Sequence, residues 1–409
     1  MSGTKGLRIA VLSDFHAYVS RPDDKIASPS WLDLAQIQSD PERNAFAGLI
    51  ERIKIDAIRA DVLLCCGDLG DKADPTGLQY VWGEVEKVRV ALDAEITLAA
   101  AGNHDVDSRY IHSGFDAKGQ VQALKPRFPV DDERGWLEYW AKNFTIVEVG
   151  SARFILLNSA AYHGAAKDGQ PPEYVHGRVS DHTISRLIAD LKDGGERAAN
   201  ILVCHHHPFK NDKIATSDYS QMKNGDKLIN NLVDAELGPW ILIHGHKHQG
   251  RVFYAQGGNS YPTVFGAASF SAKPYPDQVG HTFNEFYVME IEVPTAVGEV
   301  SSLLGKIDTW SWSYGDGWRR PQVNEGFGPR AGFGARVDIG QLAKQIATGL
   351  HQNHAGKPVS WKDVGKQHNY VNHLVPEELS RLIGLLEKYH QLGITRDNDY
   401  GEIAEVQVP

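Results

Sequence analysis

Cysteine is scarce in this chain, and long apolar runs are missing. Only three cysteines occur among 409 residues. Cys65, Cys66 and Cys204 all lie in apolar stretches, so we expect buried thiols and no disulfide framework. Nowhere do roughly 18 consecutive apolar residues occur, which excludes a transmembrane helix, and the start of the chain has no signal-peptide pattern. We therefore expect a cytoplasmic protein that makes no use of a membrane.

A surplus of positive charge is also missing. Lysine and arginine together number 42 against 52 aspartates and glutamates, which gives a formal net charge of -10 at pH 7. Such a chain has no general attraction for polyanions, so contact with nucleic acid would need a local basic groove. The hydrophobic share of 42% is ordinary for a globular protein, and the length suffices for one large domain plus an extension.

Short apolar runs rich in valine, isoleucine and leucine recur through the first 250 residues. Their apolarity is continuous rather than alternating, which predicts strands covered on both faces. They occupy residues 8–13, 62–66, 96–100, 154–158, 201–204 and 241–244. Segments with helical period lie between them, so the sequence predicts an α/β fold.

Helix signals mark several of these intervening segments. The pair Asp40-Pro41 resembles a helix cap followed by proline at the first helical position. Further helices are expected over residues 78–92 and over 180–191, the latter with Ser180 as its cap.

The pattern changes after Gly250. Residues 263–265, 285–293 and 307–314 predict strands of a second, more antiparallel sheet packed on the first. Residues 319–336 are rich in glycine and arginine, like a linker, and helices are expected over 337–351 and 376–390. We expect one domain over 1–318, and over 319–409 a linker and a small, mainly helical C-terminal extension.

Five motifs of metal-binding residue types follow five of the predicted strands, at the place where open α/β sheets bind ligands. They are Asp14-Phe15-His16, Gly67-Asp68-Leu69-Gly70-Asp71, Gly102-Asn103-His104-Asp105, His205-His206-His207-Pro208 and Gly245-His246-Lys247-His248. Oxygen donors mixed with imidazole suit Mn, Fe or Zn. One ion cannot use them all, and a carboxylate can bridge two ions, for which Asp68 is the candidate. On a loop, His246 and His248 can diverge and serve different ions.

This ordered series resembles the calcineurin-like metallophosphoesterases over residues 14 to 248. The resemblance implies a two-sheet αββα sandwich with a dinuclear site. By it, one ion would be bound by Asp14, His16, Asp68 and His248, and the other by Asp68, Asn103, His206 and His246. The family's H-[HS]-P pattern aligns with His206-His207-Pro208, which favours His206 over its competitor His205.

The resemblance also assigns roles beside the metals. A metal-bridging hydroxide would attack phosphorus in line with the leaving oxygen. His104 would contact phosphate and protonate the leaving group. Asp105 is a candidate to hold the His104 ring in one tautomer, with a structural turn as the equal alternative. Asp71 stands where purple acid phosphatases have a metal-binding tyrosine, and it would orient a histidine ligand.

We therefore expect a dimetal phosphoesterase that hydrolyses a small phosphodiester, or else a phosphomonoester, of nucleotide type. One alternative is a nuclease, suggested by Trp310, Trp312, Tyr314 and Trp318 as a possible stacking platform. Period-two spacing favours a strand that buries one face instead. The other alternative is an interaction scaffold with a vestigial metal site.

Overall fold

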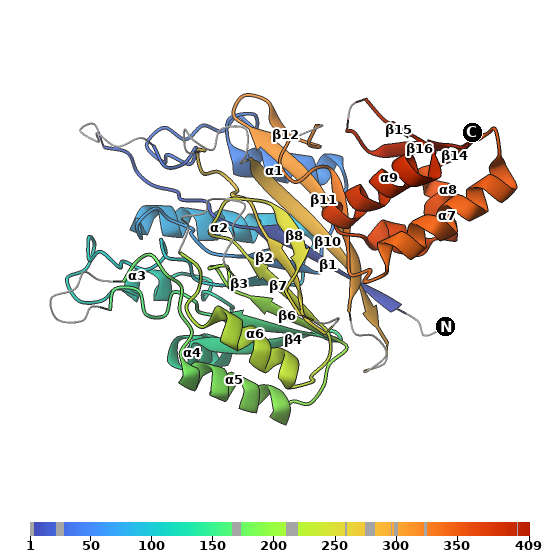
Figure 1. The fold of residues 1–409 in the computed structure, drawn as a ribbon. Coiled ribbons are helices and arrows are strands. Elements are labelled where there is room, and N and C mark those ends of the chain that lie inside the picture. The colour runs from blue at the N-terminus through green and yellow to red at the C-terminus, as the bar shows by residue number, and fades with distance from the viewer. Residues whose placement is uncertain are drawn as a thin grey trace.

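Two β-sheets packed face to face between helices form the body of the protein, as the resemblance implies (Figure 1). The computed structural model describes residues 4–21, 28–165, 173–209, 220–257, 260–274, 283–295, 297, 302–322, 325–398 and 400–409. Among them, no helix has the length and apolarity needed to cross a membrane.

The first sheet has the strand order β12-β11-β10-β1-β2-β3, with β13 also paired to β11. The strands β1, β2 and β3 are parallel, whereas β10 runs antiparallel to β1. Their bounds are β1 Thr4–Leu12, β2 Val62–Cys65, β3 Ile96–Ala99, β10 Asn284–Pro294, β11 Leu304–Ser313, β12 Gly317–Arg319 and β13 Arg330–Phe333. On this sheet lie the helices α1 Ala45–Ile55 and α2 Pro75–Leu92.

The second sheet has the order β4-β5-β6-β7-β9-β8. Its bounds are β4 Phe144–Val149, β5 Ala152–Leu157, β6 Ala199–Val203, β7 Trp240–His244, β8 Arg251–Tyr254 and β9 Thr263–Gly266. The helices α5 Asp181–Asp193 and α6 Gly225–Asp234 pack on its outer face. Two shorter elements, α3 Gly119–Gln122 and α4 Glu133–Lys142, lie in the long connection between β3 and β4.

The six predicted strands of the first half are confirmed, but the expected separate sheet after Gly250 was wrong. Strand β9 joins the second sheet beside β7, and β10 and β11 extend the first sheet from the edge of β1. The error has a physical reason. An alternating pattern identifies a strand but carries no information about its partner, which for β10 is the first strand of the chain.

Strand alternation divides the core into two layers. On β5, Phe154 and Leu156 point into the core between the two sheets, whereas Ile155 and Leu157 pack beneath α5 and α6. Both faces of the central strands are therefore buried, which explains their unbroken apolar sequences.

Local capping agrees with the sequence at α5 and differs at α1. Ser180 accepts a hydrogen bond from Thr183 N at the start of α5, as predicted. The predicted start of α1 was wrong, because Asn44 is the cap and accepts from Phe46 N and Ala47 N. Asp40 instead closes the preceding turn by accepting from Glu42 N.

The C-terminal part contains more strand than expected. It consists of α7 Ile339–His354, β14 Pro358–Ser360, α8 Trp361–Gln367, η1 Asn369–His373, α9 Pro376–His390, β15 Gly393–Arg396 and β16 Ile403–Gln407. The three strands form their own antiparallel sheet in the order β14-β16-β15, and the unit has its own apolar cluster. Part of the expected linker is strand as well, since β13 pairs with β11.

The proposed aromatic platform is largely interior. Trp310, Trp312 and Trp318 are all buried, and the indole nitrogen of Trp318 donates to Ala45 O. Tyr314 alone among the four is exposed, and its ring stacks on Trp31. The period-two spacing therefore reflects a packed strand, and these tryptophans present no surface on which bases could stack.

Candidate metal centre

The five motif loops converge at one edge of the sandwich. Strands β1, β2 and β3 of one sheet and β5, β6 and β7 of the other each run parallel within their sheet. Each motif begins within three residues of the end of its strand, on β1, β2, β3, β6 or β7. The loops therefore meet where the carboxyl ends of the two sheets face each other.

Left-handed backbone is concentrated in these loops. Asp14, His16, Asp68, His246 and His248 have φ values of 57°, 51°, 56°, 77° and 53°. Such a conformation costs a residue other than glycine roughly 1–3 kcal/mol, and it gathers at functional sites. The tight turns aim neighbouring side chains in directions that a strand would not allow.

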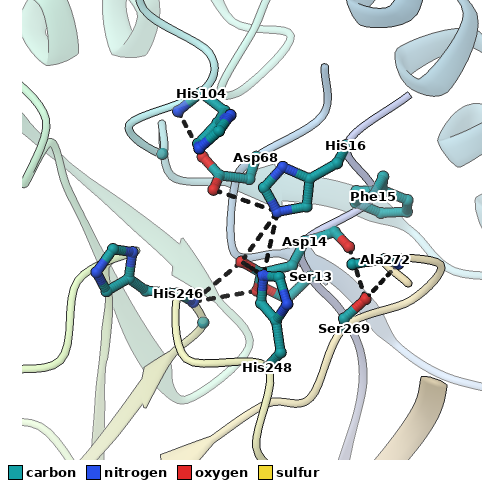
Figure 2. A network of polar contacts seen from close by, with 12 residues as sticks. Ser13, Asp14, Phe15, His16, Asp68, His104, His246, His248, Ser269 and Ala272 are labelled. Carbon is teal, nitrogen blue, oxygen red and sulfur yellow. Dashed lines mark hydrogen bonds and ion pairs between the residues drawn. The ribbon is translucent and has the colours of Figure 1, made fainter. Parts of the chain in front are cut away.

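Four side chains form a first cluster (Figure 2). His16 Nε2 lies 3.1 Å from His248 Nε2, 3.6 Å from Asp68 Oδ2 and 3.9 Å from Asp14 Oδ1. His248 Nε2 lies 3.3 Å from Asp14 Oδ1. These are the four residues that the resemblance assigns to one ion.

A second cluster adjoins the first and also contains Asp68. His205 Nε2 lies 3.3 Å from Asp68 Oδ2 and 3.1 Å from Asn103 Oδ1. His246 Nδ1 lies 3.1 Å from the same Asn103 oxygen. His246 and His248 thus diverge into different clusters, as their loop position suggested.

The spacing of these atoms fits metal coordination. Ligands about 2.1 Å from one ion stand roughly 3.0–3.4 Å apart at octahedral and tetrahedral angles. Most of the separations given above, from 3.1 to 3.3 Å, fall in this range, and the distances of His16 Nε2 to Asp68 Oδ2 and Asp14 Oδ1, 3.6 and 3.9 Å, lie above it. The single oxygen Asp68 Oδ2 belongs to both clusters, which is one of the arrangements in which a carboxylate can bridge two ions.

The electrostatics of the clusters favour a cation. Burial alone would raise the pKa of Asp68, but His205 and His104 hold it well below its usual value. Burial alone would lower the pKa of His205, but Asp68 raises it to about 9, so positive charge between these two side chains is stabilised. Burial lowers the pKa of His16 to about 4, which leaves a neutral imidazole that can bind metal.

His206 occupies a different place from His205. Its Nδ1 lies 2.9 Å from the hydroxyl of Ser159, which follows β5. Its Nε2 is buried without a hydrogen-bond partner among the described residues. His205, in contrast, places Nδ1 2.7 Å from the carbonyl oxygen of Cys66 and turns Nε2 toward Asp68, which is how metal-binding histidines are usually oriented.

His104 lies beside the clusters, and its partner is Asp71. His104 Nδ1 lies 2.9 Å from Asp71 Oδ1, and its backbone N–H donates to Asp68 Oδ1 at 2.7 Å. Burial would lower the pKa of His104, but Asp68 and Asp71 raise it. We expected Asp105 to hold the His104 ring, but Asp71 contacts this ring instead. We also expected Asp71 to orient a metal-binding histidine, but His104 is not one of the expected metal ligands.

Asp105 ties two motif loops together. Its carboxylate accepts from Asp68 N at 2.9 Å, from Leu69 N at 2.6 Å and from Gly102 N at 2.7 Å. Of its two predicted roles, these contacts match the structural one. Gly102 is needed here, because a Cβ at that position would collide with the Asp68 carboxylate.

A cavity of about 300 Å³ opens above the two clusters. Besides the motif residues, its walls contain Arg109, Tyr174, Val175 and Ser220. These residues could not be identified from the sequence, because they lie in loops of ordinary polar composition that are far apart along the chain. Nothing local signals that they meet.

The comparisons with known proteins agree with this geometry. A family model described as calcineurin-like phosphoesterase matches residues 7–250, more than half of the chain. No curated protein matches the chain.

Several solved structures match the chain at low sequence identity and with TM-scores below 0.5. A purple acid phosphatase from yellow lupin is 12% identical with a TM-score of 0.46 and covers 76% of this chain, which in turn spans 55% of that protein. The calcineurin-like phosphoesterase YfkN from Bacillus subtilis is 13% identical with a TM-score of 0.35, covering 77% and 88% of the two chains. The NAD nucleotidase of Haemophilus influenzae is 13% identical with a TM-score of 0.36, covering 78% and 54%.

The family assignment rests on the matched model together with the converging motifs. With its five motif loops inside the matched residues, the chain belongs to the calcineurin-like phosphoesterase family and is a metal-dependent phosphoric ester hydrolase.

Proposed function

We propose that this protein hydrolyses a small phosphodiester, or a phosphomonoester, of nucleotide type at a dinuclear centre of Mn, Fe or Zn. The observation that carries the proposal is Asp68 Oδ2, which lies 3.6 Å from His16 Nε2 and 3.3 Å from His205 Nε2. One carboxylate oxygen shared by two sets of nitrogen and oxygen donors would suit a bridge between two cations. A vestigial site would have no reason to keep every donor.

We assign one ion to Asp14, His16, Asp68 and His248, and the other to Asp68, Asn103, His205 and His246. The replacement of His206 by His205 is supported by the distances of His205 to Asp68 and Asn103. His206 then lies next to the site, with its Nδ1 2.9 Å from the hydroxyl of Ser159 and its ring centre 4.7 Å from that of His246.

Two bound cations would supply an activated water and would neutralise the charge of the phosphoryl oxygens. The remaining chemistry falls to the protein. His104 lines the cavity. Its Nδ1 lies 2.9 Å from Asp71 Oδ1 and 3.1 Å from Lys72 N, and Asp68 and Asp71 raise its pKa. We therefore assign His104 to protonate the leaving oxygen and Asp71 to position it.

The hydrolytic proposal is tested with purified protein reconstituted with Mn²⁺, Fe²⁺ or Zn²⁺. Bis(p-nitrophenyl) phosphate and p-nitrophenyl phosphate report on diester and monoester cleavage. We expect Asp68→Asn to lower kcat/KM about a hundredfold or more, whereas Asp234→Asn, an exposed residue of α6, leaves it unchanged. If no metal supports cleavage of either ester, or if Asp68→Asn equals wild type, the proposal fails.

Elemental analysis separates the two histidines. We expect about two metal equivalents in the wild type, about one in His205→Ala and about two in His206→Ala. The opposite result for these two variants would return the ligand role to His206, and a folded wild-type protein that binds no metal would support the scaffold alternative.

A further inference from the structure

The rim of the metal cavity carries a cation that the proposed chemistry does not use. Arg109 is half-buried and lines the cavity, and its guanidinium carbon lies 4.4 Å from the centre of the Tyr174 ring. Among the described residues no carboxylate forms an ion pair with Arg109, whose contact is with the Tyr174 ring. Arginines stacked on an aromatic face in this way keep the edge of the guanidinium fork free for an anion.

The acidic side chains nearest to this pair in sequence accept hydrogen bonds from other groups. Asp107 accepts from Ile111 N at 2.8 Å, from His112 N at 2.7 Å and from Ser113 N at 2.9 Å. These bonds close the loop that presents Arg109, so Asp107 shapes the loop and does not neutralise the cation.

Glu173, which precedes Tyr174, likewise accepts hydrogen bonds from the backbone of its own loop. Its Oε1 accepts from Val175 N at 3.1 Å and from His176 N at 3.0 Å. Its Oε2 lies 3.8 Å from Lys223 Nζ. The loop bearing Tyr174 is therefore held by its own acid and leaves the charge of Arg109 uncompensated.

The two loops are also joined to each other. The hydroxyl of Tyr110, next to Arg109, donates to Gly164 O at 2.8 Å, and Gly164 N donates to Glu173 O at 2.9 Å. Arginine and tyrosine thus come from separate segments that are fixed together, so the stacked pair is built before any substrate arrives.

The position of the pair indicates which part of a substrate it meets. Asp68 and Asn103 on the floor of the cavity are 2% and 6% exposed, whereas Tyr174 on the rim is 38% exposed. The scissile phosphate belongs on the floor with the metal ligands and His104. The rim faces the portion of the substrate that extends outward from it.

Resting on the proposed function, we infer that Arg109, held by Tyr174, binds a second anionic group of the substrate, so that the enzyme prefers phosphoesters carrying a further phosphate or carboxylate. The bidentate fork of arginine suits both groups. Arg109 is a specificity-determining residue here, and Tyr174 is a positioning residue.

Competition kinetics test this with a matched pair of ligands. Adenosine 5′-monophosphate and adenosine 3′,5′-bisphosphate share the same nucleoside and differ by one phosphate. Each is used to inhibit hydrolysis of bis(p-nitrophenyl) phosphate or p-nitrophenyl phosphate by the Mn²⁺-loaded enzyme. In the wild type we expect the inhibition constant of the bisphosphate to be about tenfold to a hundredfold lower.

Four variants locate the effect, and a fifth is the control. In Arg109→Gln the two inhibition constants should come within about threefold of each other, and Arg109→Lys should restore part of the difference. Tyr174→Phe keeps the aromatic face and should retain the preference, whereas Tyr174→Ala should reduce it. Arg186→Gln, on the exposed face of α5, changes the net charge equally and should behave like the wild type.

Equal inhibition by both ligands in an active wild-type enzyme overturns the inference. So does an Arg109→Gln variant that weakens both ligands by the same factor, because Arg109 would then hold the scissile phosphate. An enzyme that cleaves neither reporter under any metal is a different result, since that outcome overturns the proposed function itself.

Discussion

Glu285 is the buried acid whose substitution gives the sharpest test of the structure outside the metal centre. It lies on β10 and is 1% exposed. The hydroxyl of Tyr287 donates to its Oε2, and Phe327 N donates to its Oε1 at 2.8 Å. Burial raises the pKa of Glu285 to about 7, and the charge of Glu325 contributes to the same effect.

The size of the contribution to the free energy of unfolding follows from the difference between the pKa of Glu285 in the folded protein and in the unfolded protein. An unfolded glutamate has its ordinary pKa of 4.5. At about 1.4 kcal/mol per pH unit, the gap up to a pKa of about 7 corresponds to about 3 kcal/mol. The pKa of Glu285 is higher in the folded protein than in the unfolded protein. Its contribution to the free energy of unfolding is therefore fully present below pH 4.5 and is lost as the pH rises through about 7.

Glu285→Gln should remove this loss. Glutamine keeps the shape and still accepts from Tyr287, but it cannot ionise. Between pH 5 and pH 8, which span most of the titration, the free energy of unfolding of the variant relative to the wild type should therefore rise by about 2–3 kcal/mol.

Urea denaturation at pH 5, 6, 7 and 8 measures the difference. Glu290→Gln, at an exposed position of the same strand, is the control and should follow the wild type at every pH. If the difference between Glu285→Gln and wild type is the same at pH 5 and pH 8, then the carboxyl of Glu285 titrates normally and the reasoning about its burial is refuted.

Two further predictions concern local structure. Gly83 lies on the exposed side of α2, and no atom lies within 4 Å of the place that a Cβ would occupy. Gly83→Ala should therefore raise the free energy of unfolding, measured by urea denaturation, by about 0.5–1 kcal/mol. A decrease in this free energy would contradict the prediction. Ser180 caps α5 by accepting a hydrogen bond from Thr183 N. Ser180→Ala should therefore lower the free energy of unfolding by about 1 kcal/mol, whereas Ser180→Asp should retain most of the stability. An unchanged free energy of unfolding in Ser180→Ala would show that the cap contributes nothing.

Features encoded locally were predictable from the sequence. The strands β1, β2, β3, β5, β6 and β7 are recognisable as unbroken apolar runs because both of their faces are covered. The motifs follow those runs directly, so their convergence at one edge of the sandwich was predictable as well.

Features that depend on distant partners were not predictable in this way. β4 was not predicted, and half of it is only partly buried or exposed, which leaves it without a continuous apolar run. β10 was predicted as a strand, but its pairing with β1 is a contact between segments that are far apart along the chain. The stacking of Arg109 on Tyr174 is of the same kind, since each residue alone is an ordinary loop residue.

The choice between His205 and His206 shows where the physics of a strand says more than a motif. Aligning the following His-Pro favours His206. Strand alternation favours His205: at the end of β6, Val203 points into the core between the sheets, and Cys204 points toward α5 and α6.

If that alternation persists just past the strand, residue 205 shares the side of Val203 and residue 206 the side of Cys204. His205 reaches across to Cys66 and Asp68 of the opposite sheet, whereas His206 places Nδ1 beside Ser159 of its own sheet and its ring centre 4.7 Å from that of His246. In the ligand sets that we propose, Asp68 follows a strand of one sheet and His246 follows a strand of the other, so a bridged pair of ions would lie between the sheets. The position of His205 between the sheets therefore supports our proposal that His205, rather than His206, is the ligand.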